Sequence, residues 1–134
     1  MQSEAQDLEF SPGNFSIDGV PVACGNVTYV VTPQVNDVGT ANPGGVIYLN
    51  PNLLASSSTS MKLFWAAHEC GHFVTGPDES MADCWAIRTG RNQGWFPPQV
   101  FAEMGGVFRS NPGDFTHAPG VVRLQRMADC YRAP

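Results

Sequence analysis

The sequence predicts an α+β domain in which a small N-terminal β-sheet is followed by about four helices. Segments rich in β-branched and aromatic residues lie before residue 50, and apolar residues recur at helical spacing after residue 60. Strands that precede the helices, rather than alternating with them, are typical of this class. The 134 residues, 43% of them hydrophobic and 14% charged, suit one domain with one core.

The strand signals lie in the N-terminal half. Residues 1–18 show little apolar periodicity, so we expect a loosely ordered N-terminal arm there and a single domain over residues 19–134. Val, Thr and Tyr are frequent in residues 20–31, which predicts a hairpin or two short strands. Residues 46–49 are predicted as a further strand, whereas the Gly- and Asn-rich residues 36–45 are predicted as a loop.

Two helices are expected to follow the sheet directly. The apolar stretch from Met61 to Val74 predicts the first helix, which ends at Gly76-Pro77 because proline has no amide hydrogen to donate. Asp78 is a good N-cap, so a second helix is expected to run from there to about Thr89, with Gly90 as its stop.

Apolar spacing predicts two further helices near the C-terminus. Pro97-Pro98 can open the third helix, because proline is well suited to the first helical turn. A loop rich in Asn, Pro and Gly is expected over residues 111–120. The last helix is predicted from about Val121 to Tyr131, where apolar side chains form one stripe.

The strongest functional signal lies inside the first predicted helix. His68, Glu69 and His72 form an HExxH motif, in which the histidines are four positions apart. Positions i and i+4 share one face of a helix, so both imidazoles can reach one zinc ion. Glu69 then stands beside the ion and can take a proton from a water molecule, which is the arrangement of a catalytic zinc site.

A zinc ion of this kind needs a third protein ligand, and the second predicted helix offers two carboxylates. Glu79 and Asp83 are four residues apart and share a face of that helix. One of them can bind the ion while the other orients a histidine. We favour Glu79 as the ligand and Asp83 as the orienting residue, with Asp83 as the alternative ligand.

Residues 44–90 resemble the gluzincin metallopeptidases, in a minimal single-domain form. In that family HExxH is followed by a helix with the pattern Glu-x-x-Ala-Asp, whose glutamate is the third ligand, and Glu79, Ala82 and Asp83 fit this pattern. The gap between His72 and Glu79 is shorter than is usual there, and the family's membrane helices have no counterpart. The aspzincins, with an aspartate ligand after HExxH, are a rival resemblance that would select Asp83, although their Gly-Thr-x-Asp context is absent.

The gluzincin resemblance implies a metallopeptidase-like domain with a zincin-like active-site helix and one zinc ion. Such an enzyme hydrolyses peptide bonds with a metal-activated water, for which Glu69 is the general base. His117 is the one remaining histidine and a candidate for stabilising the transition state, with Tyr48 and Tyr131 as further candidates. The predicted strand of residues 46–49 is a candidate edge for binding an extended peptide.

Charge and hydropathy limit the partners. The net charge is −5 and the seven basic residues form no cluster, so we expect no nucleic-acid partner. No apolar run reaches the roughly 20 residues of a membrane span. The expected partner is a peptide or protein substrate. The alternatives are a non-catalytic, zinc-containing binding module with a zincin-like fold, and a deformylase-type hydrolase, whose Glu-Gly-Cys motif is absent.

Four cysteines in a chain of this length favour two disulfides and an oxidising compartment. The candidates are Cys24, Cys70, Cys84 and Cys130, and their spacing leaves three pairings open. Disulfides predict a secreted or periplasmic protein. The N-terminal residues lack the basic and apolar regions of a signal peptide, so we expect that signal to have been removed.

Overall fold

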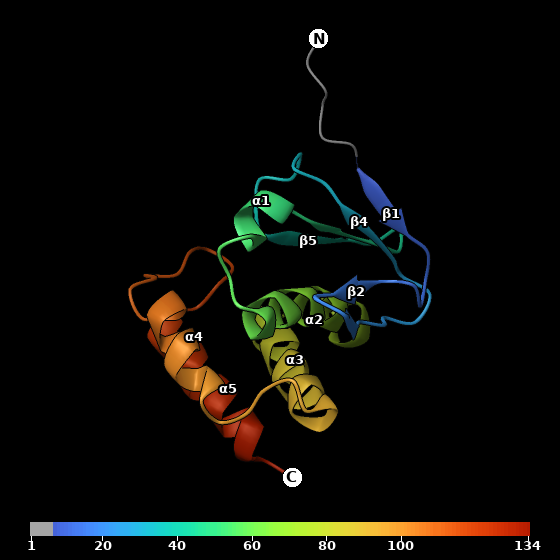
Figure 1. Ribbon diagram of the computed structural model, residues 1–134. Coiled ribbons are helices and arrows are strands. Elements are labelled where there is room, and N and C mark those ends of the chain that lie inside the picture. The colour runs from blue at the N-terminus through green and yellow to red at the C-terminus, as the bar shows by residue number, and fades with distance from the viewer. Residues whose placement is uncertain (1–6) are drawn as a thin grey trace.

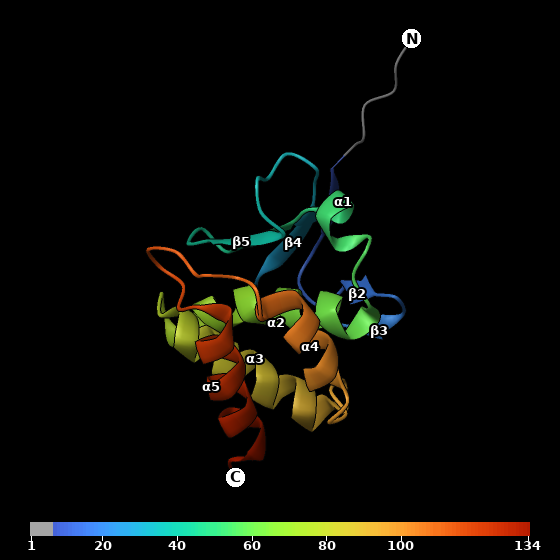
Figure 2. The same ribbon diagram turned by 90° about the vertical axis from the view of Figure 1, so that its left-hand side faces the viewer.

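A small mixed β-sheet packs against a layer of helices, and the computed structural model describes residues 7–134 of this arrangement (Figure 1, Figure 2). The strands are β1 (Leu8–Phe10), β2 (Ser16–Ile17), β3 (Val20–Pro21), β4 (Thr28–Val31), β5 (Gly39–Asn42) and β6 (Val46–Leu49). The helices are α1 (Pro51–Leu54), α2 (Thr59–Thr75), α3 (Glu79–Gln93), α4 (Val100–Phe108) and α5 (Gly120–Arg132). The predicted α+β class is confirmed, with α1 as an additional short helix.

The main sheet has the strand order β1-β4-β6-β5, and β2 and β3 form a separate pair. Strands β4 and β6 are parallel, whereas β1 pairs with β4 and β5 pairs with β6 in the antiparallel direction. The strand predicted at residues 46–49 is present as β6, in which Ile47 and Leu49 are buried and Val46 and Tyr48 are half-buried. The buried side chains share one core with Phe64 of α2, which seats this helix against the sheet (Figure 1).

The N-terminal segment is better ordered than the sequence predicts. Of the arm expected over residues 1–18, residues 1–6 lie outside the described part of the chain, and for residues 7–18 the prediction is wrong. Strand β1 pairs with β4, and Phe15 and Ile17 are buried in the core. Phe15 stacks on Tyr29, with ring centroids 4.4 Å apart. Isolated apolar anchors separated by turns hold this segment, and they leave no periodic pattern in the sequence.

The predicted loop over residues 36–45 is wrong as well, because this stretch contains β5. Gly45 has a φ of 94° and donates its amide hydrogen to the Asn42 carbonyl oxygen, which turns the chain back onto β6. Strand β6 therefore lies inside the sheet, and the free edge beside it in the described chain is β5. The sequence Asn42-Pro43-Gly44-Gly45 before an apolar strand was a hairpin signal for this arrangement.

The four predicted helices are present as α2 to α5. Ser58 and Asp78 cap α2 and α3 with side-chain oxygens that accept from backbone amides. The predicted stop at Gly90 is wrong, because α3 continues to Gln93 and ends at Gly94, whose φ is 79°. Gly90 serves packing instead, since a Cβ atom there would lie 1.9 Å from the ring of Phe96. No helix within residues 7–134 is long and apolar enough to span a membrane.

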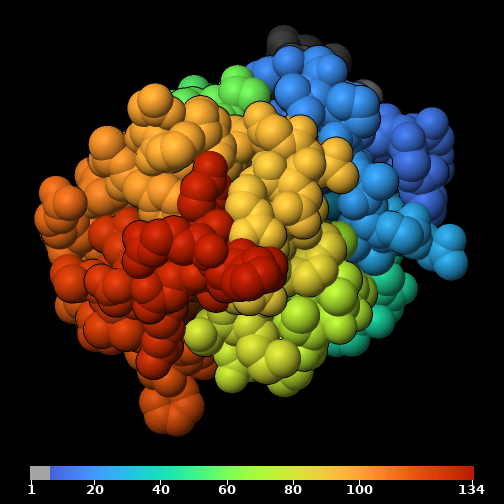
Figure 3. Space-filling model, turned by 90° about the horizontal axis from the view of Figure 1, so that it is seen from below, coloured from blue at the N-terminus to red at the C-terminus, as the bar shows by residue number. Residues whose placement is uncertain are grey.

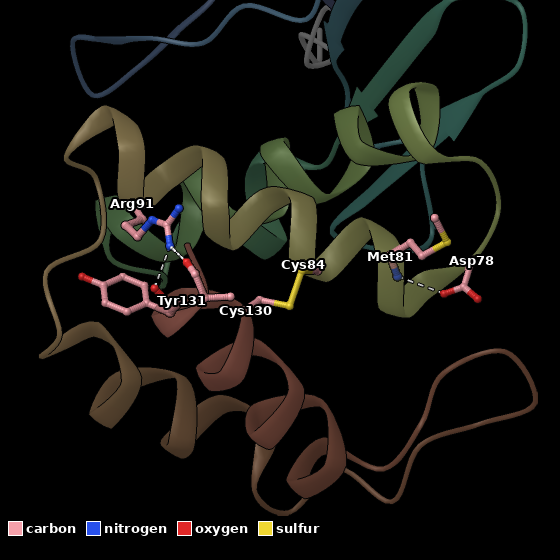
Figure 4. The surroundings of a disulfide bond; sticks show 7 residues. Asp78, Met81, Cys84, Arg91, Cys130 and Tyr131 are labelled. Carbon is pink, nitrogen blue, oxygen red and sulfur yellow. Dashed lines mark hydrogen bonds between the residues drawn. A yellow bond between two sulfur atoms is a disulfide. The ribbon is translucent and has the colours of Figure 1, made fainter.

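All four cysteines are paired, which confirms the two predicted disulfides and selects one of the three pairings. Cys24–Cys70 joins the segment before β4 to the middle of α2. Cys84–Cys130 joins α3 to α5, and Figure 4 shows this bond between the two helices. The space-filling view in Figure 3 shows that α5 and α3 also lie side by side at the surface. The C-terminal helix is thus fastened to the helix that carries Glu79 and Asp83.

Candidate metal centre

Helices α2 and α3 approach each other closely at the HExxH motif. A Cβ atom added to Gly71 would lie 3.0 Å from both the Cα atom and the carbonyl oxygen of Ala82. The glycine inside the motif therefore allows the two helix backbones to come within contact distance. This crossing brings the two motif histidines of α2 beside the acidic side chains of α3.

His68 is the most deeply buried of the histidines, with 4% of its side chain exposed. Its Nε2 atom lies 2.8 Å from Oε1 of Glu79, and its Nδ1 atom donates to Oδ1 of Asp83 over 2.8 Å. Asp83 also accepts two hydrogen bonds of 2.8 Å from the guanidinium of Arg123 on α5. Asp83 thus connects His68 to Arg123, and that guanidinium lies 4.7 Å from the centre of the Phe108 ring.

His72 and His117 point to the same oxygen atom of Glu79. Their Nε2 atoms lie 3.2 Å and 3.1 Å from Oε1 of that residue. The Nδ1 atom of His72 donates to the carbonyl oxygen of Gly76, and that of His117 lies 3.0 Å from Oδ1 of Asp114. Three imidazoles, each supported at Nδ1, therefore converge through Nε2 on one carboxylate.

This convergence fits a bound cation. A carbonyl oxygen or an ionised carboxylate can only accept a hydrogen bond, so each Nδ1 atom must carry the proton. A ring protonated at Nδ1 can offer its Nε2 atom either to a proton shared with Glu79 or, in the neutral form, to a metal ion. A metal ion among these atoms would satisfy the three Nε2 atoms and the carboxylate oxygen together, and histidine rings held through Nδ1 are typical of metal sites.

The structure groups the candidate ligands differently from the sequence. His68, Glu79 and His117 each offer one ligand atom, and these atoms all lie within 4.8 Å of one another. His72 is outside that group of three, although it contacts the same Glu79 oxygen. The sequence predicted His68, His72 and Glu79 as ligands, and the structure brings all three together with His117 as a fourth member.

Charge shapes the ionisation of this cluster. Burial lowers the pKa of His68, but the hydrogen bonds with Asp83 and Glu79 outweigh burial and raise that pKa to about 9. Burial raises the pKa of Glu79, yet the hydrogen bond with His68 holds it below its ordinary value. Burial likewise opposes the ionisation of Asp83, and the hydrogen bonds from Arg123 and His68 keep the pKa of that carboxyl low.

Glu69 lies beside the cluster and lines a cavity of about 590 Å³. Burial raises the pKa of Glu69, while the neighbouring His68 and His72 oppose that rise. Among residues 7–134 we find no side-chain hydrogen bond to Glu69, so its oxygens are available to a water molecule in the cavity. The cavity walls combine the cluster with strand β5 and its flanks, namely Asp37, Gly39, Thr40, Ala41, Pro43, His68, Glu69, His72, Phe73, Gly76, Pro77, Glu79 and His117.

Gly39 on β5 makes room for Glu69. A Cβ atom at this position would lie 3.1 Å from Cγ of Glu69 and 3.0 Å from Cδ2 of Leu49. The strand can therefore pass directly over the glutamate, and it forms the wall of the cavity opposite α2. This wall is the free edge of the sheet, whereas the sequence predicted residues 46–49 as a candidate edge.

The other two candidates for stabilising the transition state, Tyr48 and Tyr131, do not line the cavity. Tyr131 instead donates its hydroxyl hydrogen to the carbonyl oxygen of Phe96. Sequence reasoning missed Arg123, although an arginine within the apolar stripe of the last helix was a signal that its side chain needs a buried acidic partner. Comparison of the chain with models of protein families, with curated proteins and with solved structures gave no match.

Proposed function

We propose that the protein is a zinc-dependent peptidase of the gluzincin type, in which Glu69 is the general base. The observation that carries the proposal is the convergence of three Nδ1-supported imidazoles and one carboxylate oxygen beside a cavity that Glu69 lines. Nitrogen and carboxylate ligands in this combination suit zinc. His68, His72 and Glu79 would hold the ion, and Asp83 would orient His68.

A bound zinc ion supplies Lewis acidity, which polarises a carbonyl group and makes a water molecule more acidic. Glu69 would accept the proton of the attacking water and deliver it to the leaving amine. Its burial supports this role, because a carboxyl group with a raised pKa exchanges a proton more readily near neutral pH. Within residues 7–134 its side chain makes no other hydrogen bond, which leaves it able to hold that water.

A peptide substrate would bind along β5. The outer edge of this strand has no pairing partner within the described sheet, and the strand lines the cavity opposite the cluster. An extended peptide can form main-chain hydrogen bonds with such an edge, which places successive side chains on alternate sides. The cavity has the size of a typical ligand site. Peptide hydrolysis therefore fits this geometry better than a reaction on a small, compact substrate.

The two disulfides support an extracellular or periplasmic setting for this enzyme. Bonds of this kind form and persist in oxidising compartments and are rare in reducing ones. Both bonds lie near the proposed site, since Cys70 belongs to the HExxH motif and Cys84 follows Asp83 directly. Protein substrates would be met in the same compartment.

The test is cleavage of a diverse quenched-fluorescence peptide pool by the zinc-loaded protein. The matched control is Glu69→Gln, which keeps the side-chain volume and removes the base, with equal zinc content verified by elemental analysis. We expect cleavage by the wild-type protein and a loss of roughly 10²- to 10⁴-fold in the variant. Cleavage that is equal in both proteins would contradict the role of Glu69. Zinc binding without cleavage by either would favour a non-catalytic binding module.

A further inference from the structure

We infer that His117 is a fourth protein ligand of the proposed metal ion, carried on a loop that closes the site until substrate displaces it. This loop, residues 110–119, connects α4 to α5 and is called the His117 loop below. The inference rests on the proposed function for the presence of zinc. It adds a ligand that the HExxH pattern does not include, and a closed resting state.

The first support is the position of the His117 side chain. Its Nε2 atom lies 3.1 Å from Oε1 of Glu79, and it belongs with His68 and Glu79 to the group whose ligand atoms lie within 4.8 Å of one another. Its Nδ1 atom is held by Asp114, as that of His68 is held by Asp83. A surface histidine with no role in the cluster would have no reason to share this orientation.

The second support is the coordination number that results. Zinc in proteins is almost always four-coordinate, and catalytic sites keep one of the four positions open for water or substrate. His68, His72, Glu79 and His117 together supply four ligands and leave no open position. His117 also forms part of the cavity wall, so its displacement would free both a coordination position and space for a substrate.

The third support is the way in which the His117 loop is attached. Both ends are pinned: Asn111 donates its amide hydrogen to Phe108, and Gly120 donates to Asn111. Gly120 also packs so closely that an added Cβ atom would lie 1.7 Å from the carbonyl oxygen of Phe108. Between the ends, the hydrogen bonds found in the described chain stay within the loop, as when Asp114 accepts from Thr116 and His117. Apart from the backbone hydrogen bonds at its two ends, the His117–Glu79 contact is the one polar link from the loop to another element that the described residues show.

The exposure of the His117 side chain fits a ligand that can dissociate from the metal ion. His117 has 29% of its side chain exposed, against 4% for His68 and 16% for His72. Phe115, two residues before His117, is fully exposed at 104%. Figure 3 shows the segment between α4 and α5 projecting from the body of the molecule. Loss of one metal contact would therefore release the loop without disturbing the core.

The first experiment identifies the ligands in the zinc-loaded protein by long-range proton–nitrogen NMR correlation of labelled histidines. We expect all three rings to show a protonated Nδ1 and a metal-bound Nε2, and His117 to keep that pattern between about pH 6 and 8. Binding of His68 and His72 with a free, titrating His117 would overturn the inference and leave the proposed metal centre standing. Three free rings would instead refute the metal centre itself.

The second experiment compares His117→Ala with Phe115→Ala, a control in the same loop that removes an uncontacted side chain. By competition with a chelator, His117→Ala should bind zinc at least about tenfold more weakly, and Phe115→Ala should match the wild type. At saturating zinc, His117→Ala should cleave small peptides severalfold faster than the wild type, because its site stays open. Unchanged zinc affinity, or slower cleavage as expected for a transition-state stabiliser, would overturn the inference.

Discussion

His68 and His117 point to the same carboxylate oxygen but are supported in opposite ways. Behind His68 stand Asp83 and Arg123, and these side chains are 3% and 8% exposed. Behind His117 stands Asp114, whose side chain is 64% exposed, in a loop that bonds mainly to itself. His68, Asp83 and Arg123 come from three packed helices and form the fixed side of the cluster. His117 and Asp114 come from a surface loop and form its movable side.

The difference indicates which contacts form when the chain folds, before a metal binds, and which contacts can form afterwards. A buried carboxylate between a histidine and an arginine is stable only when all three are in place, because each charge left alone in the interior is costly. The His68 side is therefore organised by folding itself. The His117 side depends on one contact and can exchange between bound and released states at small cost. A site with one fixed and one movable side suits a reaction that must admit a large substrate.

The largest effect on stability and on zinc affinity is expected from Asp83→Ala, a substitution on the fixed side of the cluster. The substitution leaves Arg123 buried without its acidic partner and should lower the free energy of unfolding by about 3–5 kcal/mol. It also removes the acceptor that orients His68, so zinc affinity should fall roughly 10- to 100-fold. Urea unfolding of the metal-free protein and chelator competition measure the two effects. If both stability and zinc affinity kept their wild-type values, the buried contacts among His68, Asp83 and Arg123 would not organise the site.

The next effect is expected from removing Cys84–Cys130, which fastens α5 and Arg123 to α3. The double variant with alanine at both positions should lose about 2–4 kcal/mol of stability. The matched control removes Cys24–Cys70, which has the same sequence separation of 46 and so the same loop-closure entropy. Zinc affinity should fall more for the first pair than for the second. Equal losses of affinity would mean that Arg123 reaches Asp83 without the covalent tether.

A pH-dependent loss of stability is the third expectation, for the metal-free protein. The pKa of His68 is about 9 in the folded state against an ordinary value of 6.5, with Asp83, Glu79 and Glu69 around the ring. A raised pKa stabilises the fold fully below pH 6.5, and this contribution disappears as the pH rises through 9. The loss should be on the order of 3 kcal/mol, since a pKa difference of one is about 1.4 kcal/mol.

Urea unfolding at a series of pH values measures this loss. His117→Ala is the control, because it leaves His68, Asp83 and Arg123 untouched and should keep the same dependence on pH. A variant that lost the dependence would show that the two sides of the cluster are not independent. With zinc present the trend should reverse, since coordination needs deprotonated imidazoles.

The smallest effect is expected from Asp114→Asn on the movable side. An asparagine oxygen can still accept from the amides of Thr116 and His117, so the turn should persist and the unfolding midpoint should stay unchanged. Zinc affinity should fall by less than about tenfold, because the ring of His117 loses only a charged acceptor. Thermal unfolding and chelator competition provide the comparison with Asp83→Ala. An affinity loss as large as that of Asp83→Ala would contradict the division into a fixed and a movable side.

The two sides also differ in how well the sequence predicted them. His68, Glu69 and His72 lie on one helix, and spacing along a helix is a local property that a sequence displays directly. The same holds for the Asp78 cap and for the alternation in β6. Strand β5 was missed because its residues have weak strand preferences, and its place depends on pairing with β6 rather than on composition.

The sequence by itself determined the helix that carries the motif, the presence of paired cysteines and the order of sheet before helices. Only the tertiary structure decided which carboxylate meets the Nε2 atoms of the three histidines, because Arg123, 40 residues away, and Nδ1 of His68 engage the oxygens of Asp83, whereas Glu79 lies at the Nε2 atoms. It also decided the disulfide pairing, the edge strand and the position of His117. Periodicity depends on residues that are close in the sequence, so the sequence shows it directly. A contact between distant elements depends on how the whole chain buries its apolar surface and pairs its polar and charged groups.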